Sequence, residues 1–192
     1  MMCDQYYIAR RGQRAVDRSM AINWNKFKNH FKTIEVPAKT ILLREGQVSR
    51  TMFYIEKGCL RTFVDNEGKE ITTQFFFEDE SVSSIESFRK KTPSFYSIES
   101  LEPSVLLTLS DKDFHQILEE SPEMRKEMEE HLFTRLFKSQ QMFYSFLKNS
   151  PQKRYEELIA RYPHIVQRVP QHYIASYLGI TSVSLSRIRN RR

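Results

Sequence analysis

The sequence has few cysteines, no long apolar run and no apolar leader, and each shortage excludes a class of protein. Its two cysteines, Cys3 and Cys59, are too few for a disulfide framework, a four-thiolate metal site or a four-cysteine iron–sulfur cluster. No run approaches the roughly 18 apolar residues of a membrane span, and the Arg-rich residues 1–20 lack the core of a secretory signal. We therefore expect a reduced cytoplasmic protein without a membrane partner, and a disordered leader or tail at residues 1–20.

The motifs of catalysis and of cofactor binding are missing as well. The chain has no P-loop, no nucleophile elbow and no dinucleotide fingerprint, and its five histidines show no metal-ligand spacing. We therefore expect a protein that is not an enzyme, with no catalytic residue, no metal ligand and no evident cofactor.

The positive charge is concentrated near the C-terminal end. The formal net charge is +6, yet residues 148–192 hold nine Lys and Arg residues against only Glu156 and Glu157. A basic segment on a nearly neutral body is typical of a protein that binds a polyanion. A solvated, charged terminus would give the same composition, so charge alone leaves both interpretations open.

Residues 21–120 show mostly strand-like patterning. Short apolar segments recur at 40–43, 52–55, 60–64, 71–77 and 105–109, with Gly46, Gly58 and Gly68 among the turn residues between them. Glycine adopts the positive φ that tight turns require. Many short strands with regular turns predict a β sandwich or barrel, preceded by a short helix at 24–31.

A long helix is predicted at residues 121–148. Ser121 is a good N-cap, and Pro122 suits the first helical position. The predicted helix is roughly 39 Å long, so its apolar stripe extends beyond a small domain and needs a partner. We expect a homodimer through this stripe; packing on the chain's own strand domain is the alternative. The expected dimer-interface residues are Met124, Met128, Leu132, Leu136 and Phe143.

Residues 149–192 predict a helix-turn-helix. Ala175 is a small residue where two helices would cross, and Gly179 falls at the C′ position of the first helix. Thr181 can cap the second helix, which Leu185 and Ile188 would anchor to the first. A two-helix hairpin is common, but this full spacing together with several arginines predicts binding to double-stranded DNA.

The second helix of this motif is expected to enter the major groove, where its outward residues meet base edges. Arg187 is the expected base reader, because a guanidinium pairs bidentately with guanine; a contact to phosphate alone is the alternative. Thr181 and Ser182 lie at the helix N-terminus, which suits phosphate. The expected DNA-binding residues are Thr181, Ser182, Val183, Ser186, Arg187, Asn190 and Arg191.

Taken together, residues 22–192 resemble the Crp/FNR family of bacterial transcription regulators. The matching stretches are ILLREG at 41–46, MFYIEKGCLR at 52–61 and VPQHYIASYLGITSVSLSRI at 169–188. The resemblance implies an α+β fold, with a cyclic-nucleotide-binding-like jelly roll (a double-stranded β-helix) at 21–120, a dimerisation helix at 121–148 and a winged-helix-like DNA-binding domain at 149–192. It also implies a two-fold DNA site, with RNA polymerase as a candidate partner.

The sequence departs from the family pattern in three places. Members that bind cyclic nucleotides use a Gly-Glu pair and an Arg followed by Ser or Thr. The corresponding stretches here are Asp79-Glu80 and Ser94-Phe95, so the Arg is missing. Two cysteines exclude the family's four-cysteine iron–sulfur cluster. The wing that normally follows the second helix has no counterpart before Arg192, so either the wing is short or missing or the sequence is truncated.

The missing Arg argues against cyclic AMP as the effector, since a buried phosphate without its cation is costly. We expect core side chains to fill the interior, and an unknown small-molecule effector in an apolar pocket is the alternative. If a ligand binds the β domain, the candidate residues are Glu80, Phe88, Ser94 and Phe95.

Two functions fit these features. The first is a sequence-specific, homodimeric transcription regulator whose sensor domain does not bind cyclic AMP in the usual way. The second is a ligand-sensing module that regulates a protein partner without specific DNA binding, which would leave the basic end of the chain unexplained.

Overall fold

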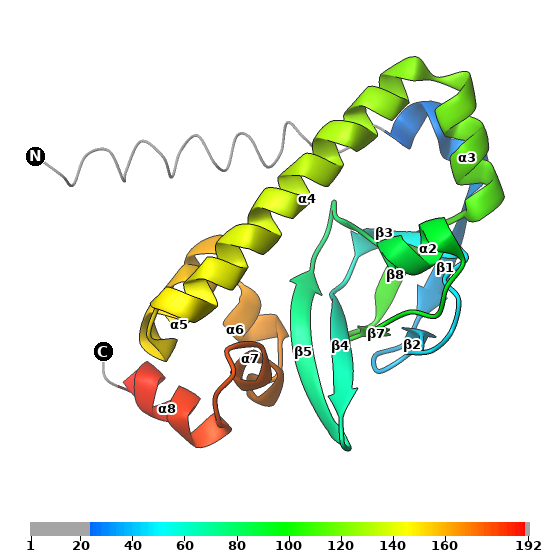
Figure 1. Ribbon diagram of the computed structural model, residues 1–192. Helices are drawn as coiled ribbons and strands as arrows, with labels where there is room; N and C mark the ends of the chain where they lie inside the picture. Colours follow the sequence, from blue (N-terminus) through cyan, green and yellow to red (C-terminus); the bar gives the residue numbers. More distant parts are fainter. Residues whose placement is uncertain (1–23, 191–192) are drawn as a thin grey trace, which may run out of the picture.

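The computed structural model describes residues 24–190 (Figure 1). The leader or tail expected at residues 1–20, and Arg191 among the expected DNA-binding residues, lie outside the described residues. Within the described part, no helix is long and apolar enough to cross a membrane.

Within residues 24–190, eight strands form two four-stranded antiparallel sheets that face each other as a jelly roll. The sheet orders are β1-β8-β3-β6 and β2-β7-β4-β5. The strands are β1 (Phe31–Val36), β2 (Ile41–Leu43), β3 (Thr51–Lys57), β4 (Leu60–Asn66), β5 (Lys69–Phe76), β6 (Ser81–Val82), β7 (Ser97–Ser100) and β8 (Ser104–Ser110). The expected α+β fold with an N-terminal β roll is confirmed.

The helices precede, interrupt and follow the roll. They are the 3₁₀ helix η1 (Trp24–His30), then α2 (Ile85–Lys90), α3 (Asp111–Glu120), α4 (Pro122–Lys148), α5 (Pro151–Arg161), α6 (Ile165–Arg168), α7 (Gln171–Tyr177) and α8 (Ser182–Asn190). Ser121 caps α4 as expected, because its Oγ accepts a hydrogen bond from the Met124 N–H at 3.2 Å. Figure 1 shows α4 running from α3 past the roll to the C-terminal helices.

Apolar side chains fill the interior of the roll. Successive residues of a strand point to opposite faces. Phe53 and Ile55 of β3 therefore point between the sheets, where they pack with Leu60, Phe76 and other apolar residues. Met52 points to the outer face of the same sheet and joins a second cluster with Phe88, Phe114 and Met128. The packing of the roll interior agrees with the expectation of a filled interior.

The sequence pattern did not predict three of the strands and one of the helices. β1 is an edge strand with alternating exposure, so its Lys32, Thr33 and Glu35 hide its periodicity. β6 and β7 are short and rich in serine, and α2 is only six residues long. Such elements are specified by the strands and helices that pack around them rather than by local periodicity.

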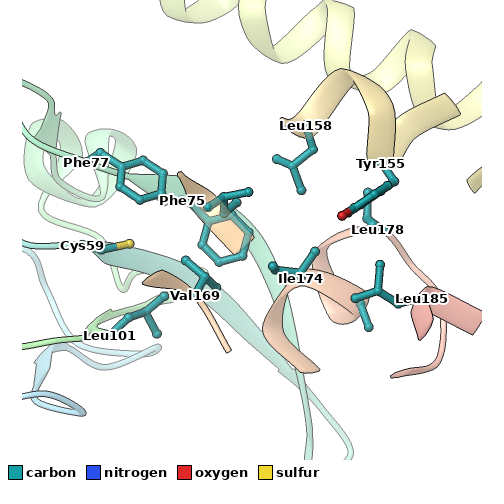
Figure 2. Close-up of a cluster of buried hydrophobic side chains, with 12 residues drawn as sticks. Cys59, Phe75, Phe77, Leu101, Tyr155, Leu158, Val169, Ile174, Leu178 and Leu185 are labelled. Atoms are coloured by element: carbon teal, nitrogen blue, oxygen red, sulfur yellow. The ribbon is translucent and has the colours of Figure 1, made fainter. Parts of the chain in front are cut away.

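The C-terminal helices share a hydrophobic core with the roll. Figure 2 shows Cys59, Phe75 and Phe77 of the roll facing side chains of the C-terminal helices. Buried members from the C-terminal helices and their caps include Tyr155, Leu158, Val169, Ile174, Leu178 and Leu185. The helix-turn-helix is therefore docked on the roll of the same chain.

Candidate nucleic-acid interface

Helices α7 and α8 form a helix-turn-helix with the geometry that the sequence predicts. Leu178 is the C-cap of α7, and Gly179 takes a left-handed backbone conformation with φ +65°. The Ile180 N–H donates to the Ala175 carbonyl at 3.0 Å, which closes the turn. Ala175 is 2% exposed, in agreement with the small residue expected at the crossing of the two helices.

Helix α8 begins at a side-chain cap. The Oγ1 of Thr181 accepts a hydrogen bond from the Ser184 N–H at 3.1 Å, so the expected N-cap is confirmed. Leu185 is fully buried in the shared core, and Ile188 packs against that core. Together they fix the rotation of α8 about its own axis.

One face of α8 is left open to solvent. Ser182, Val183, Ser186, Arg187 and Asn190 are all exposed, and Val183 is 62% exposed. Among residues 24–190, Arg187 makes no ion pair or hydrogen bond, so its guanidinium is available to a ligand. Five of the expected DNA-binding residues thus share one accessible face. The hydroxyl of Thr181, by contrast, is used by the cap.

Helix α7 is held against strand β5 of the roll. The Oγ of Ser176 donates to the Glu70 carbonyl and accepts from the Thr72 N–H, each at 3.0 Å. Next to this contact, the ring of Tyr173 lies over the guanidinium of Arg61, 3.9 Å from its Cζ. Arg61 itself is fully buried and donates to Glu99 at 2.7 Å. The roll therefore sets the orientation in which α8 is presented.

A second contact ties the helices to the roll through charge. Arg168 of α6 donates to both carboxylate oxygens of Glu78, at 2.7 and 2.8 Å, and also pairs with Glu102. Burial would raise the pKa of Glu78, but the hydrogen bonds from Arg168 and from the Gly58 N–H lower it to about 2. The two carboxylates in turn raise the pKa of Arg168, so the ion pair is fully charged at neutral pH.

Of the four candidate ligand residues of the β domain, Phe88 lines the cavity described below, and Glu80, Ser94 and Phe95 do not line it. Glu80 accepts a hydrogen bond from the Phe77 N–H at 2.8 Å, and Ser94 donates to the Tyr96 carbonyl at 2.7 Å. Phe95 is 70% exposed, whereas Phe88 is buried.

Helix α4 corrects the expected dimer interface. Met124 and Met128 are 4% and 9% exposed, because the first turns of α4 pack on α3 and on the outer face of the roll. They are thus core residues of their own chain. Leu132, Leu136 and Phe143 are 43%, 50% and 60% exposed. The exposed stripe also holds Phe133, Phe137, Tyr144 and Leu147.

Three buried or half-buried arginines were not anticipated from the sequence, namely Arg61, Arg135 and Arg168. Arg135 of α4 donates to the Ser81 carbonyl at 3.1 Å and lies 5.4 Å from the centre of the Phe76 ring. Arg61 stands inside an otherwise apolar segment, which is a usable sequence signal for a buried ion pair. Arg135 and Arg168 are also flanked by uncharged residues, but their partners Ser81, Glu78 and Glu102 lie far away in sequence, so local sequence does not indicate these contacts.

Comparison with known proteins shows that the roll is similar to one domain family. Residues 33–121 match the model of the cyclic nucleotide-binding domain. The cAMP-activated global transcriptional regulator CRP of Salmonella typhimurium is 22% identical over 111 residues, which is 57% of this chain and 53% of that protein. The corresponding regulator of Pasteurella multocida is 23% identical over a stretch of the same length. The chain spans about half the length of the curated relatives it matches.

Solved structures share the fold over most of the chain. FixK2 from Bradyrhizobium japonicum has a TM-score of 0.73 at 9% identity, covering 84% of this chain and 83% of that one. The c-di-GMP responsive global regulator CLP of Xanthomonas campestris has a TM-score of 0.67 at 16% identity, covering 87% and 88%. A CooA mutant from Carboxydothermus hydrogenoformans also has a TM-score of 0.67, at 19% identity.

Proposed function

We propose that this chain, which is of the Crp/FNR type in its domain content and its fold, is a transcription regulator that binds specific sequences in double-stranded DNA. The observation that carries the proposal is the free outer face of α8, where Arg187 and four smaller exposed residues stand together. A helix presented in this way fits the major groove, and its N-terminal side chains reach base edges.

The side chains on the exposed face of α8 suit different parts of the DNA. The unpaired guanidinium of Arg187 suits the two acceptors of guanine, and Val183 suits the methyl group of thymine. Ser182, at the N-terminus of α8, suits a phosphate oxygen. Arg189 adds positive charge, and with it salt-dependent affinity for the DNA backbone.

A homodimer completes the proposed function. Leu136, Phe137 and Phe143 leave a long apolar stripe of α4 exposed, which is costly for a monomer in water. Pairing of two α4 helices buries the stripe and relates two α8 helices by a two-fold axis. The target is then two half-sites about one DNA turn, or roughly 34 Å, apart.

The roll acts as the sensor domain in this proposal, and its effector is not a cyclic nucleotide that binds in the way usual for the family. A cyclic phosphate would need a free cation, but the guanidinium of Arg135 already donates to the Ser81 carbonyl. Apolar side chains also fill the interior of the roll. An input to the roll can reach α8 through α4 or through the Arg168–Glu78 contact. RNA polymerase is the candidate protein partner downstream.

The proposal is tested by selecting duplexes from a random-sequence DNA library with the full chain. We expect enrichment of a two-fold site, and a steep linear fall of log affinity with log salt for that site. A scrambled duplex of equal length is the control for non-specific binding. Failure to enrich any sequence, or equal affinity for the selected and scrambled duplexes at every salt concentration, would contradict the proposal in favour of a module that regulates a protein partner.

A further inference from the structure

A cavity of about 490 Å³ lies outside the roll, between its sheet and helices α2, α3 and α4. Met52 contributes to its wall from the outer face of β3, opposite to the residues that fill the roll interior. Further apolar side chains in its wall include Phe88, Phe114, Leu118, Met128 and Leu132. The volume falls within the range of about 300–1,000 Å³ that is typical of small-molecule sites.

The charged groups around this cavity are mostly basic. Arg89, Arg125 and Arg135 line it together with His131, against a single carboxylate, Glu129. Two of these arginines are engaged, since Arg125 donates to the Leu118 carbonyl at 2.8 Å and Arg135 donates to the Ser81 carbonyl. The third, Arg89, is exposed and makes no ion pair or hydrogen bond within residues 24–190.

His131 supplies a ring nitrogen without a partner, which donates to a carboxylate when the neutral ring carries its proton on Nε2. Its Nε2 is buried and makes no hydrogen bond to any residue that the structure describes. Burial, followed by the charges of Arg135 and Lys138, lowers the pKa of His131 to about 4, so the imidazole is neutral at physiological pH. A buried ring nitrogen without a partner is costly, and a ligand atom in the cavity can satisfy it.

We propose that this cavity binds a small monocarboxylate with an apolar body, whose carboxylate faces Arg89 and His131. The apolar body lies among Phe88, Phe114 and Met128, where burial of its surface supplies most of the binding free energy. The planar guanidinium of Arg89 suits a carboxylate, because both are planar and can form two parallel hydrogen bonds. A nucleotide fits this cavity poorly, since its sugar and base would face an apolar wall.

Such a ligand would be the effector of the proposed regulator. Its regulatory role rests on the proposed function, but its binding to the cavity does not. Met128, His131, Leu132 and Arg135 lie on consecutive turns of α4, so an occupant contacts the helix that joins the roll to the C-terminal helices. Leu132 also begins the exposed stripe. A ligand can therefore bias how α4 pairs.

Isothermal titration calorimetry of the full chain without DNA tests the inference. The probes are octanoate, 4-phenylbutanoate and, as the neutral control, octan-1-ol. We expect saturable binding of at least one carboxylate, and at least tenfold weaker binding of the alcohol. No saturable heat with either carboxylate, or equal affinity for octanoate and octan-1-ol, would overturn the inference.

Two variants locate the site. Arg89→Gln is expected to weaken carboxylate binding about fivefold to tenfold, whereas Lys90→Gln, its exposed neighbour on α2, should leave it unchanged. Ile85→Trp places a large ring in the cavity and should abolish binding, with thermal unfolding confirming that it folds. Unchanged binding in folded Ile85→Trp would overturn the inference. Because DNA is absent, these outcomes are independent of the proposed function, which fails only in the DNA selection.

Discussion

Arg168 of α6 and Glu78, which follows β5, form a bidentate ion pair across ninety positions of sequence, with nitrogen–oxygen distances of 2.7 and 2.8 Å. The pair joins the short helix in front of the helix-turn-helix to the end of a strand of the roll. Glu102, in the turn before β8, completes the cluster from a third segment. This contact and the shared hydrophobic core make the orientation of α8 a property of the whole chain.

Loss of the Arg168 side-chain charge should therefore destabilise the docked state. We expect Arg168→Gln to lower the free energy of unfolding by about 1–2 kcal/mol, because Glu78 and Glu102 then face each other without a cation. Urea denaturation measures this change. Lys153→Gln is the control, since its ion pair with Glu156 is long, at 3.8 Å, and exposed. Equal midpoints for the two variants would contradict a structural role for Arg168.

The same pair predicts a specific acid sensitivity. The pKa of Glu78 is lowered from 4.5 to about 2, so its contribution to stability is complete above pH 4.5 and is lost as the pH falls toward 2. Glu78→Gln should be less stable than the parent by about 1 kcal/mol at pH 6, after allowance for partial exposure of the carboxylate. The difference should shrink between pH 4.5 and pH 2 in denaturation curves. A difference that stays constant with pH would show that the charge of Glu78 does not matter.

Arg187 should determine sequence preference rather than affinity alone. With a selected site in hand, Arg187→Ala is expected to lose about 1–3 kcal/mol of discrimination at one base position. Arg189→Ala should weaken all duplexes about equally and reduce the salt dependence. Competition binding with duplexes changed one base pair at a time measures both effects. Uniform weakening by Arg187→Ala would assign that residue to phosphate.

The exposed stripe of α4 should hold two copies together. We expect the parent chain to sediment as a dimer, and Leu136→Glu to sediment as a monomer, because a carboxylate buried in the apolar pairing face costs several kcal/mol. Gln141→Glu changes an exposed polar residue of the same helix and should remain dimeric. Sedimentation velocity distinguishes the species. A monomeric parent chain at micromolar concentration would contradict pairing through α4.

Gly58 should be far less tolerant of substitution than Gly68, although both have positive φ. A Cβ at Gly58 would lie 2.1 Å from the Ser104 Oγ, whereas a Cβ at Gly68 would meet nothing within 4 Å. We expect Gly68→Ala to cost about 1 kcal/mol for its left-handed backbone, and Gly58→Ala clearly more, because the neighbouring strand must also move. Thermal unfolding of the two variants checks the ranking. Equal melting temperatures would contradict it.

The sequence alone was sufficient for the local parts of this protein. Gly179, Thr181 and Leu185 act on neighbours within a few positions, so their spacing predicted the turn, the cap and the anchor of α8 correctly. Ser121 and Pro122 likewise marked the start of α4. The glycines at 46, 58 and 68 marked turns of the roll, since positive φ is a local requirement.

The tertiary structure decided what depends on distant residues. Met124 and Met128 belong to the same apolar stripe as Leu136, and only the packing of α3 and the roll shows which part of the stripe is covered. The cavity behind Phe88 likewise needs three helices that meet only in the folded chain.

The helix-turn-helix shows both contributions. The spacing from Ala175 to Ile188 determined that two helices cross and that one presents Arg187, because those contacts are short in sequence. Where this motif sits was decided by contacts such as Ser176 with Thr72, 104 positions apart, and Arg168 with Glu78. Such contacts form only after the chain has folded back on itself, and they leave no periodic signal in the sequence.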